Sequence, residues 1–260
     1  MIKFSIITCT YNAASFLQRT LDSVKDQTWM AVEHIIMDGA STDGTADMAR
    51  RYKRESKAEG HDIVVVSERD RGLYDAMNKG IDIATGNYVL FLNAGDTLPS
   101  EDTLDIVASS VPDGNLPAVI YGDTDIVDGE GRFLRHRRLS PPDELTWRSF
   151  RYGMLVCHQA FYVRADLAKT TPYDLNYRFS ADIDWCIRIM KKAARKGLPL
   201  LRVPEVLVDY LDGGMTSKNH RASLLERFDI MRNHYGLAVT LVMHLWFVIR
   251  GLKGKLGKRR

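Results

Sequence analysis

Polar side chains that could bind a nucleotide follow four successive apolar segments in the first hundred residues. Asp38 follows the second segment and could accept hydrogen bonds from a nucleobase or a ribose. Tyr11 follows the first segment, and Arg71, after the third, could contact a phosphate or a base. Asp96 follows the fourth, where a carboxylate could hold a hard cation that bridges phosphates. Each signal is weak alone, but together they predict a nucleotide site.

The segment around Asp38 also has an interpretation that needs no ligand. Gly39 and Gly44 permit a tight turn, and Ser41 and Asp43 could cap the helix that follows. A P-loop is disfavoured because the spacing G-x-x-x-x-G is followed by Thr45 rather than by lysine, and G-x-G-x-x-G does not occur.

The elements that must position these residues are predicted from hydrophobic spacing. Short apolar runs alternate with helical patterns in the first hundred residues, which predicts βα units and a parallel sheet. The carboxyl ends of parallel strands meet at one edge of a sheet, so the four polar segments should converge there. The predicted strands are residues 3–8, 32–37, 63–67 and 88–92.

The pattern changes after a short helix that should end near residue 110. Further strands are expected, with a hairpin turn at residues 128–131, and a helix, a strand pair and a second helix follow. These strands are 118–122, 124–127 and 154–163, the strand pair lies around 200–210, and the helices are 182–196 and 222–234. We expect an α/β fold with a Rossmann-like, mostly parallel sheet flanked by helices.

Composition limits the class of protein, and the order of the predicted elements suggests its domains. The chain has 260 residues, 45% hydrophobic and 27% charged, which excludes disordered and collagen-like classes. Its three cysteines, Cys9, Cys157 and Cys186, show neither a disulfide framework nor zinc spacing, and the first residues indicate no secretion signal. We expect a domain over residues 1–215, with a nucleotide-binding half (1–98) and an acceptor-binding half (99–215). A helical extension with a basic tail occupies residues 216–260.

That tail carries the positive charge. Six cations and no acid lie in residues 250–260, so removing them turns the net charge of +3 into −3 for residues 1–249. The apolar run 237–249 has thirteen residues, fewer than the roughly 20 needed to cross a bilayer. It is either a buried core or oligomer helix, or an interfacial helix attracted to anionic lipid. No aromatic interleaving or recognition motif favours nucleic acid. A second basic run, 135–138, is either a solvated loop or an anion contact.

The order and spacing of four motifs resemble glycosyltransferase family 2. They read F-S-I-I-T-C-T-Y-N, I-I-M-D-G-A-S-T-D-G-T, G-L-Y-D-A-M-N-K-G-I and A-T-G-N-Y-V-L-F-L-N-A-G-D. The resemblance covers residues 2–216, is most specific over 4–96, and is nearest to bacterial exopolysaccharide and colanic-acid enzymes.

The resemblance implies a GT-A fold, a nucleotide-diphosphate-sugar donor, a Mn²⁺ or Mg²⁺ cofactor, and inversion at the anomeric carbon. It assigns Asp96 as the metal ligand. The family's D-x-D motif reads Asn93-Ala94-Gly95-Asp96 here, so the first carboxylate is absent and metal affinity should be weaker. His158 and His220 are further candidate ligands or acceptor contacts. The implied nucleotide-sugar contacts are Thr10, Tyr11, Asn12, Asp38, Arg71, Asn78, Asn93 and Ala94.

The implied catalytic base lies at the start of the predicted helix 182–196. The family's E-D-x-D pattern reads Ala181-Asp182-Ile183-Asp184 here, which makes Asp182 the general base and Asp184 a candidate for orienting the helix or the acceptor. Both carboxylates could instead only complement a helix N-terminus. Gly214 lies in a segment that resembles the family's donor-closing loop.

The sequence therefore predicts an inverting glycosyltransferase that acts on a glycan or lipid-linked acceptor in bacterial surface polysaccharide synthesis. We expect a cytoplasmic protein, peripheral on the inner face of the cell membrane through its C-terminal segment. A sugar nucleotidyltransferase and an inactive nucleotide-binding scaffold are the alternatives, and product analysis separates the three.

Overall fold

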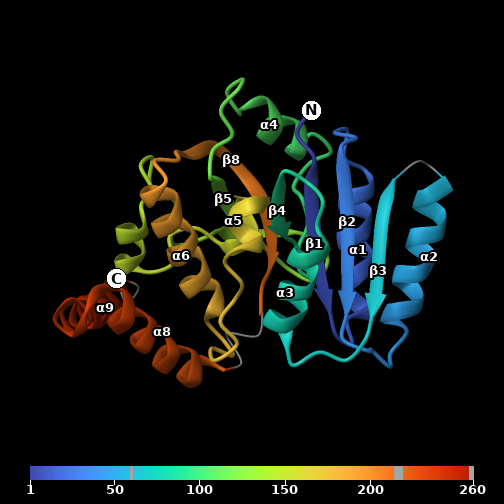
Figure 1. Cartoon of the computed structure of the whole chain (residues 1–260). Helices are drawn as coiled ribbons and strands as arrows, with labels where there is room; N and C mark the ends of the chain where they lie inside the picture. Colours follow the sequence, from blue (N-terminus) through green and yellow to red (C-terminus); the bar gives the residue numbers. More distant parts are fainter. Residues whose placement is uncertain (59–60, 214–218, 258–260) are drawn as a thin grey trace.

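One sheet organises the chain, and its strand order is β3-β2-β1-β4-β7-β5-β6, with β8 paired to β5. The computed structural model describes residues 1–58, 61–213 and 219–257. Figure 1 shows the sheet with helices on both sides. The strands are β1 (Phe4–Thr10), β2 (Val32–Asp38), β3 (Asp62–Ser67), β4 (Tyr88–Phe91), β5 (Val119–Val127), β6 (Phe133–His136), β7 (Phe161–Arg164) and β8 (Leu200–Leu211). The helices are α1 (Ala14–Lys25), α2 (Thr45–Ala58), α3 (Leu73–Ile83), α4 (Thr103–Ser109), α5 (Ala165–Lys169), α6 (Ala181–Arg195), α8 (His220–Tyr235) and α9 (Leu237–Gly257), with short 3₁₀ turns η1 (Trp147–Tyr152) and η2 (His158–Ala160).

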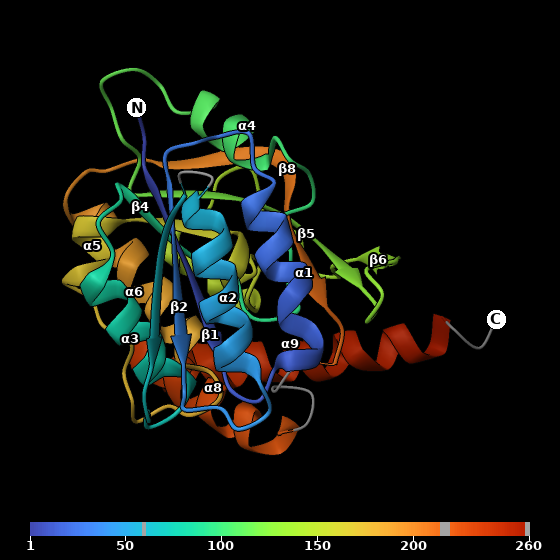
Figure 2. The same ribbon diagram turned by 90° about the vertical axis from the view of Figure 1, so that its right-hand side faces the viewer.

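The first four strands are parallel, as the sequence predicts. β1 lies between β2 and β4, and all seven of its residues are buried. Helices α1 and α2 cover one face of this part, and α3 covers the other (Figure 2). Burial on both faces explains why these strands are apolar runs rather than alternating patterns. The mostly parallel α/β architecture is confirmed, because only β6 and β7 run antiparallel to their neighbours.

The second half of the sheet differs from the prediction in three places. The predicted strands 118–122 and 124–127 form the single strand β5. The predicted strand 154–163 is reduced to β7, because residues 158–160 form η2 before β7 inserts between β4 and β5. The predicted strand pair at 200–210 is the single strand β8, parallel to β5. Pro204 cannot donate to a ladder, and the register of this pair shifts opposite it, so the break in pattern is a bulge rather than a turn.

The C-terminal helices pack against the second half of the chain. The Trp147 ring on η1 stacks on Tyr235 of α8, with centroids 5.6 Å apart and planes 2° from parallel. Thr240 and Met243 of α9 are buried, whereas eight large apolar side chains between 237 and 249 are exposed. No helix in the described part of the chain is both long and apolar enough to cross a membrane. The cysteines are buried and unpaired.

Candidate active site

Asp38 forms the centre of the polar edge at the carboxyl ends of the first strands. In the sheet register it pairs with Thr10 on β1 and with Ser67 on β3. Both hydroxyls donate to its carboxylate, at 3.1 Å from Thr10 and 2.6 Å from Ser67. The hydroxyl and the N–H of Ser41 add bonds of 2.5 and 3.1 Å. Asp38 is therefore buried in one fixed orientation, and its contact with a ligand stays a prediction.

The loops after β1, β2 and β3 converge around this carboxylate. Asn12 has a positive φ of 48°, and its side-chain oxygen accepts the N–H of Thr42, so the first loop is tied to the second. A Cβ on Gly39 would lie 2.6 Å from the carboxylate of Asp70 and 3.4 Å from the ring of Tyr11. Tyr11 is 69% exposed, which leaves its ring free to contact a ligand. The predicted convergence of these loops is thus present in the structure.

Of the two predicted capping residues, Asp43 caps helices and Ser41 does not. Asp43 accepts the N–H of Thr45 at the start of α2, and also the N–H of Ala14 at the start of α1. Ser41 bonds instead to Asp38 and to the backbone N–H of Asn12, at 2.8 Å. One acidic residue therefore serves two helix N-termini, where a negative charge is stabilising.

Two predicted donor contacts are engaged within the protein. Arg71 donates to Asp75 at 3.0 Å, and its side chain is 78% exposed at the start of α3. The Asn78 amide donates to the carbonyl of Tyr173 at 3.1 Å and accepts its N–H at 2.7 Å. Asn78 therefore connects α3 to the loop before α6, and its contact with a donor stays a prediction.

Asp96 lies in a buried turn with Asn93 and Ala94. Its two carboxylate oxygens accept the N–H of Leu211 and the side-chain amide of Gln159, both at 2.9 Å. Burial raises the pKa of Asp96 to about 7, although these two bonds oppose the shift. The side-chain oxygen of Asn93 is buried without a hydrogen-bond partner among the described residues. The turn thus contains a carboxylate and a free amide oxygen, both of which are hard ligands.

Asp182 lies on the first turn of α6, and a side chain from the first hundred residues contacts it. The hydroxyl of Tyr74, on α3, donates to its carboxylate at 3.3 Å. The Nδ1 atom of His158 lies 3.7 Å from the other carboxylate oxygen, and the His158 Nε2 atom is buried without a partner. Burial lowers the pKa of His158, so its imidazole is neutral near pH 7 and the pair is not an ion pair. Asp182 retains lone pairs for a substrate hydroxyl.

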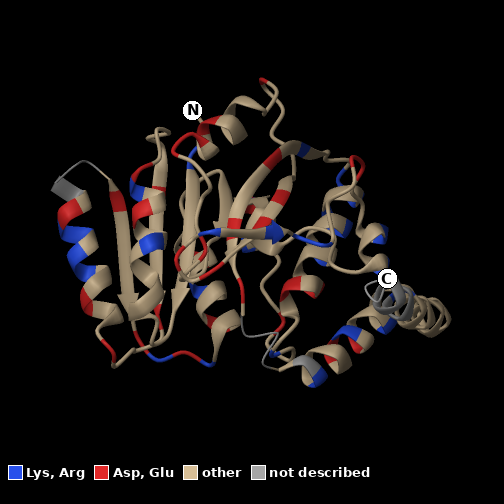
Figure 3. Ribbon diagram, turned by 180° about the vertical axis from the view of Figure 1, so that it is seen from behind, with Lys and Arg blue, Asp and Glu red and all other residues tan. Residues whose placement is uncertain are grey.

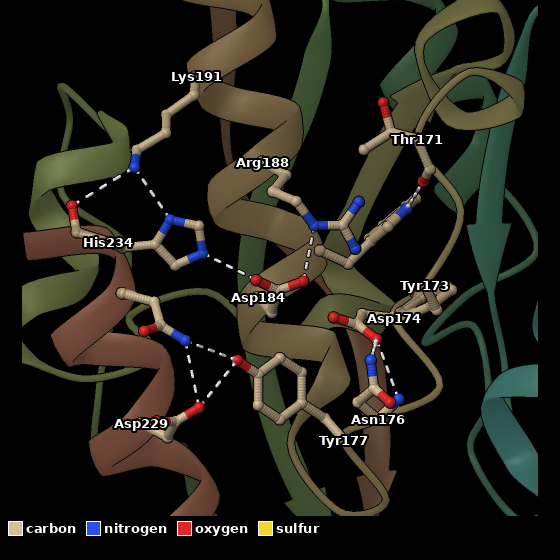
Figure 4. Close-up of polar contacts among 12 residues, drawn as sticks. Thr171, Tyr173, Asp174, Asn176, Tyr177, Asp184, Arg188, Lys191, Asp229 and His234 are labelled. Atoms are coloured by element: carbon tan, nitrogen blue, oxygen red, sulfur yellow. Dashed lines mark hydrogen bonds and ion pairs between the residues drawn. The ribbon is translucent and has the colours of Figure 1, made fainter.

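Asp184 belongs to a different set of contacts on the same helix. Its carboxylate accepts from Arg188 at 2.6 Å and contacts Nε2 of His234 at 2.8 Å (Figure 4). Burial alone would raise the pKa of Asp184, but His234 and Arg188 hold it below its usual value. Lys191 reaches the other ring nitrogen of His234 at 2.9 Å. Asp184 therefore joins α6 to α8, and its role in orienting the helix or the acceptor stays a prediction.

The basic run at 135–138 is solvent-exposed except at the half-buried Arg137, and its first two residues lie in a strand rather than in a loop. Arg135 and His136 lie in β6 and contact Asp212 at 3.3 Å and Asp125 at 2.7 Å. Arg137 donates to the carbonyls of residues 139, 154 and 155. Gly214 and the side chain of His220 lie outside the described residues.

Three polar contacts at this edge were missed by the sequence reasoning: Ser67, Tyr74 and Gln159. Ser67 is the last residue of β3 and occupies the same register position as Thr10 and Asp38, so the rule on strand ends could have found it. Gln159 lies 63 residues from Asp96 and no spacing links the two.

Comparison with known proteins places these features in a family. The sequence model of glycosyl transferase family 2 matches residues 5–170, which is more than half of the chain. The chain belongs to glycosyl transferase family 2. It is 32% identical over 242 residues to the PGL/p-HBAD biosynthesis glycosyltransferase of Mycobacterium tuberculosis, covering 92% of this chain and 89% of that one. It is 29% identical over 217 residues to the amylovoran biosynthesis glycosyltransferase AmsB of Erwinia amylovora, covering 80% and 69%.

Solved structures share the fold. TarS 1-349 from S. aureus, in complex with UDP-GlcNAc, superposes with a TM-score of 0.71 at 19% identity, over 89% of this chain and 65% of TarS 1-349. The mannosyltransferase PcManGT from Pyrobaculum calidifontis, with GDP-Man and Mn²⁺, gives 0.63 at 19% identity, over 94% and 68%. The GT-A fold is therefore confirmed, and the protein is a glycosyltransferase.

Proposed function

We propose that this enzyme transfers a glycosyl group from a nucleotide-diphosphate sugar to a hydroxyl of a glycan or lipid-linked acceptor, with inversion, in surface polysaccharide or glycolipid synthesis. The observation that carries the proposal is that two carboxylates suited to different tasks occur in one region of the fold. A fixed carboxylate, Asp38, lies where the strand ends converge, and a second carboxylate, Asp182, is reached from the same edge through Tyr74. The relatives named for glycolipid and amylovoran synthesis support the acceptor class.

The donor would lie across the carboxyl ends of β1 to β4. Asp38 would accept a hydrogen bond from the base in exchange for one of its four internal donors, with Thr10 and Asn12 beside it and the exposed Tyr11 ring available for stacking. Asn93 and Ala94 lie at the end of β4, on the side that leads to Asp182. Two structural neighbours hold nucleotide-diphosphate sugars, UDP-GlcNAc in TarS and GDP-Man in PcManGT, and this supports the donor class.

The chemistry is a single displacement at the anomeric carbon. Asp182 removes the proton of the acceptor hydroxyl as its oxygen forms the new bond to that carbon. The bond from the carbon to the diphosphate oxygen breaks, and the nucleoside diphosphate leaves with the electron pair. Attack from the side opposite the leaving group inverts the configuration. Tyr74 and the neutral His158 flank the carboxylate of Asp182.

The residues at the end of β4 fit a divalent cation such as Mn²⁺ or Mg²⁺. The unpartnered oxygen of Asn93 and the buried carboxylate of Asp96 would hold it. When bound, such a cation neutralises charge on the departing diphosphate. Within the described part of the chain, no group of three or more acidic, histidine or cysteine side chains could hold a metal by itself. The donor diphosphate would therefore complete the ligand set, and affinity without donor should be low.

The C-terminal segment 237–260 would hold the enzyme on the cytoplasmic face of the membrane. Leu241, Val242 and Leu245 are 53, 66 and 63% exposed, and no acidic residue occurs after Asp229. Figure 3 shows the part of α9 that is not grey as a largely uncharged helix, in contrast to α2. Arg250 lies over the Trp246 ring at 4.4 Å, an aromatic and cationic pair suited to a headgroup layer. Apolar burial and basic charge are the two terms that drive interfacial binding.

A donor screen tests the proposed activity. UDP-, GDP- and dTDP-sugars are added with and without Mn²⁺ or Mg²⁺, and the melting temperature is measured, since a ligand of the folded state raises it. The stabilising donor is then incubated with membranes that contain lipid-linked acceptors, and the products are analysed. Transfer with release of nucleoside diphosphate supports the proposal. Release of pyrophosphate would identify a nucleotidyltransferase, and binding without turnover would identify a scaffold; either result overturns the proposal.

A further inference from the structure

Helix α8 binds the segment that leads into the catalytic helix α6. The two carboxylate oxygens of Glu226 accept the backbone N–H groups of Arg178 and Phe179, each at 2.8 Å. These N–H groups lie three and four residues before Asp182. Hydrogen bonds from two consecutive amides to one carboxylate fix the local backbone more firmly than a single contact, and bonds to a charged acceptor are the stronger kind.

A second contact continues this connection to the first residue of the helix. The Ser180 hydroxyl, at the N-cap position of α6, makes no capping bond to its own helix. It lies 2.9 Å from the hydroxyl of Ser223 on α8 instead, and both residues are buried. Three residues in a row, 178 to 180, are thus held by α8 before the catalytic turn begins.

Asp182 itself has few constraints of its own. Its side-chain contacts are the 3.3 Å bond from Tyr74 and the 3.7 Å approach of His158, which is too long for a hydrogen bond. The direction of its carboxylate therefore depends largely on where the backbone of the first turn is placed. Glu226 also lies near this pair, because its charge contributes, after burial and Asp182, to raising the pKa of Tyr74.

We propose that Glu226 is a positioning residue for the glycosyl-transfer base, and that α8 is a structural part of the active site although it follows residue 215. The proposal rests on the proposed function, in which Asp182 removes the acceptor proton. Small displacements of a catalytic group are costly, since a misplacement of about 1 Å can reduce a rate by roughly 10²-fold. An element that holds residues 178–180 is thus placed to control the rate without contacting substrate.

Glu226→Gln tests this role, with Asp229→Asn as the matched control. Glutamine offers one acceptor oxygen, so one of the two amides loses its partner. Asp229 lies one turn further along α8 and contacts the Tyr177 hydroxyl at 3.2 Å rather than the backbone that enters α6. Both variants remove one negative charge from the same helix. The readouts are amide hydrogen exchange over residues 177–184 and the steady-state release of nucleoside diphosphate from the donor that stabilises the protein.

We expect Glu226→Gln to speed exchange at residues 178 and 179 and to lower kcat by about tenfold, with the donor KM within about twofold of wild type. Asp229→Asn should leave both readouts near wild type. Glu226→Asp, which keeps the two acceptor oxygens, should recover part of the rate. A rate equal to wild type in Glu226→Gln, or an equal loss in Asp229→Asn, would overturn the positioning role.

The double variant Glu226→Gln/Asp182→Asn separates this proposal from the proposed function. If Glu226 acts through Asp182, the double variant is no slower than Asp182→Asn alone. A further multiplicative loss would show that Glu226 acts elsewhere, and the positioning role would be wrong while the base assignment stands. Full activity in Asp182→Asn would overturn the base assignment and, with it, this proposal.

Discussion

The Ser67 hydroxyl, at the end of β3, donates to the carboxylate of Asp38, at the end of β2, across a distance of 2.6 Å. The two residues are direct neighbours in the parallel register, and Thr10 occupies the same position on the other side of Asp38. Three strand ends thus fix one buried carboxylate. A side chain with this many internal donors has one orientation before a ligand arrives, and a ligand that contacts it replaces one of these donors.

This arrangement predicts that substitution of Asp38 weakens donor binding and also lowers the stability of the fold. Asp38→Ala removes the acceptor for the base and leaves the hydroxyls of Ser67, Thr10 and Ser41 without their shared partner. Donor affinity should fall by at least tenfold, and the melting temperature should also fall because buried donors lose hydrogen bonds. Calorimetric titration with the donor measures the first effect. Ser67→Ala is the graded control, with a smaller loss, and a folded Asp38→Ala with wild-type affinity would contradict the base contact.

The cation role is tested at Asp96. Asp96→Asn keeps the size of the side chain but removes the charge that would hold Mn²⁺ or Mg²⁺, so most turnover should be lost. Wild-type turnover should also fall under chelation and return when Mn²⁺ is added. Gln159→Leu, which removes one bond to Asp96, should weaken metal dependence less than the charge removal does. Full activity of wild type under EDTA, or of Asp96→Asn, would contradict the metal role.

The C-terminal helix predicts binding to anionic liposomes. Leu241→Glu/Leu245→Glu places charges on the exposed apolar face of α9 and should abolish sedimentation with such liposomes at low salt. Met30→Glu, at a residue 65% exposed before β2, is the matched control and should sediment like wild type. Truncation after Tyr235 should also release the protein while keeping α8. If wild-type protein stays in the supernatant, α9 is an intramolecular or oligomer helix instead.

The buried His34 predicts how stability depends on pH. Its ring nitrogens lie 2.9 Å from the Thr8 hydroxyl and 3.1 Å from the Tyr52 hydroxyl, and burial lowers its pKa to about 3. The unfolded chain takes up a proton as the pH falls through about 6.5, whereas the folded protein does not. Stability from this group is therefore complete above pH 6.5 and is lost as the pH falls.

Between pH 7 and pH 5 this one group should lower the free energy of unfolding by about 2 kcal/mol. Urea unfolding at both pH values measures the loss. His34→Gln removes the titration, so the difference in stability between wild type and variant should shrink at pH 5 relative to pH 7. An unchanged difference would contradict the depressed pKa.

The sequence predicts the nucleotide half of the fold well because its determinants are local. Apolar runs and helical spacing define β1 to β4 and the helices between them, and parallel strand ends must meet at one edge, which brings Thr10 and Asp38 together. The bulged strand β8 was predicted as a pair because Pro204 interrupts its pattern as a turn would. The contact of Glu226 with Phe179 spans 47 residues and depends on how two helices pack. No spacing rule encodes such a contact, so it becomes visible only in three dimensions.

The two aspartates on the first turn of α6 should have different effects when they are substituted. Asp182→Asn preserves shape but removes the proton acceptor, so glycosyl transfer should fall by roughly 10²-fold or more while donor binding stays near wild type. Asp184→Asn should retain more transfer but lose stability, because it weakens the contacts with Arg188 and His234 and leaves the half-buried guanidinium of Arg188 with a neutral partner. A loss of roughly 3 kcal/mol in the free energy of unfolding is expected for such a pair.

Transfer rates, donor affinity and urea unfolding of both variants check this division. His234→Gln, which keeps a hydrogen-bonding group beside Asp184, is the control for this contact. It should lose stability, as Asp184→Asn does, without the large loss of transfer rate expected for Asp182→Asn. Near-normal transfer in Asp182→Asn together with complete loss in a folded Asp184→Asn would move the base to Asp184. Since Asp184 already gives both carboxylate oxygens to Arg188 and His234, a substrate hydroxyl would then have to displace one of them. Asp182, which has free lone pairs and accepts only one hydrogen bond from Tyr74 among the described side chains, needs no such exchange.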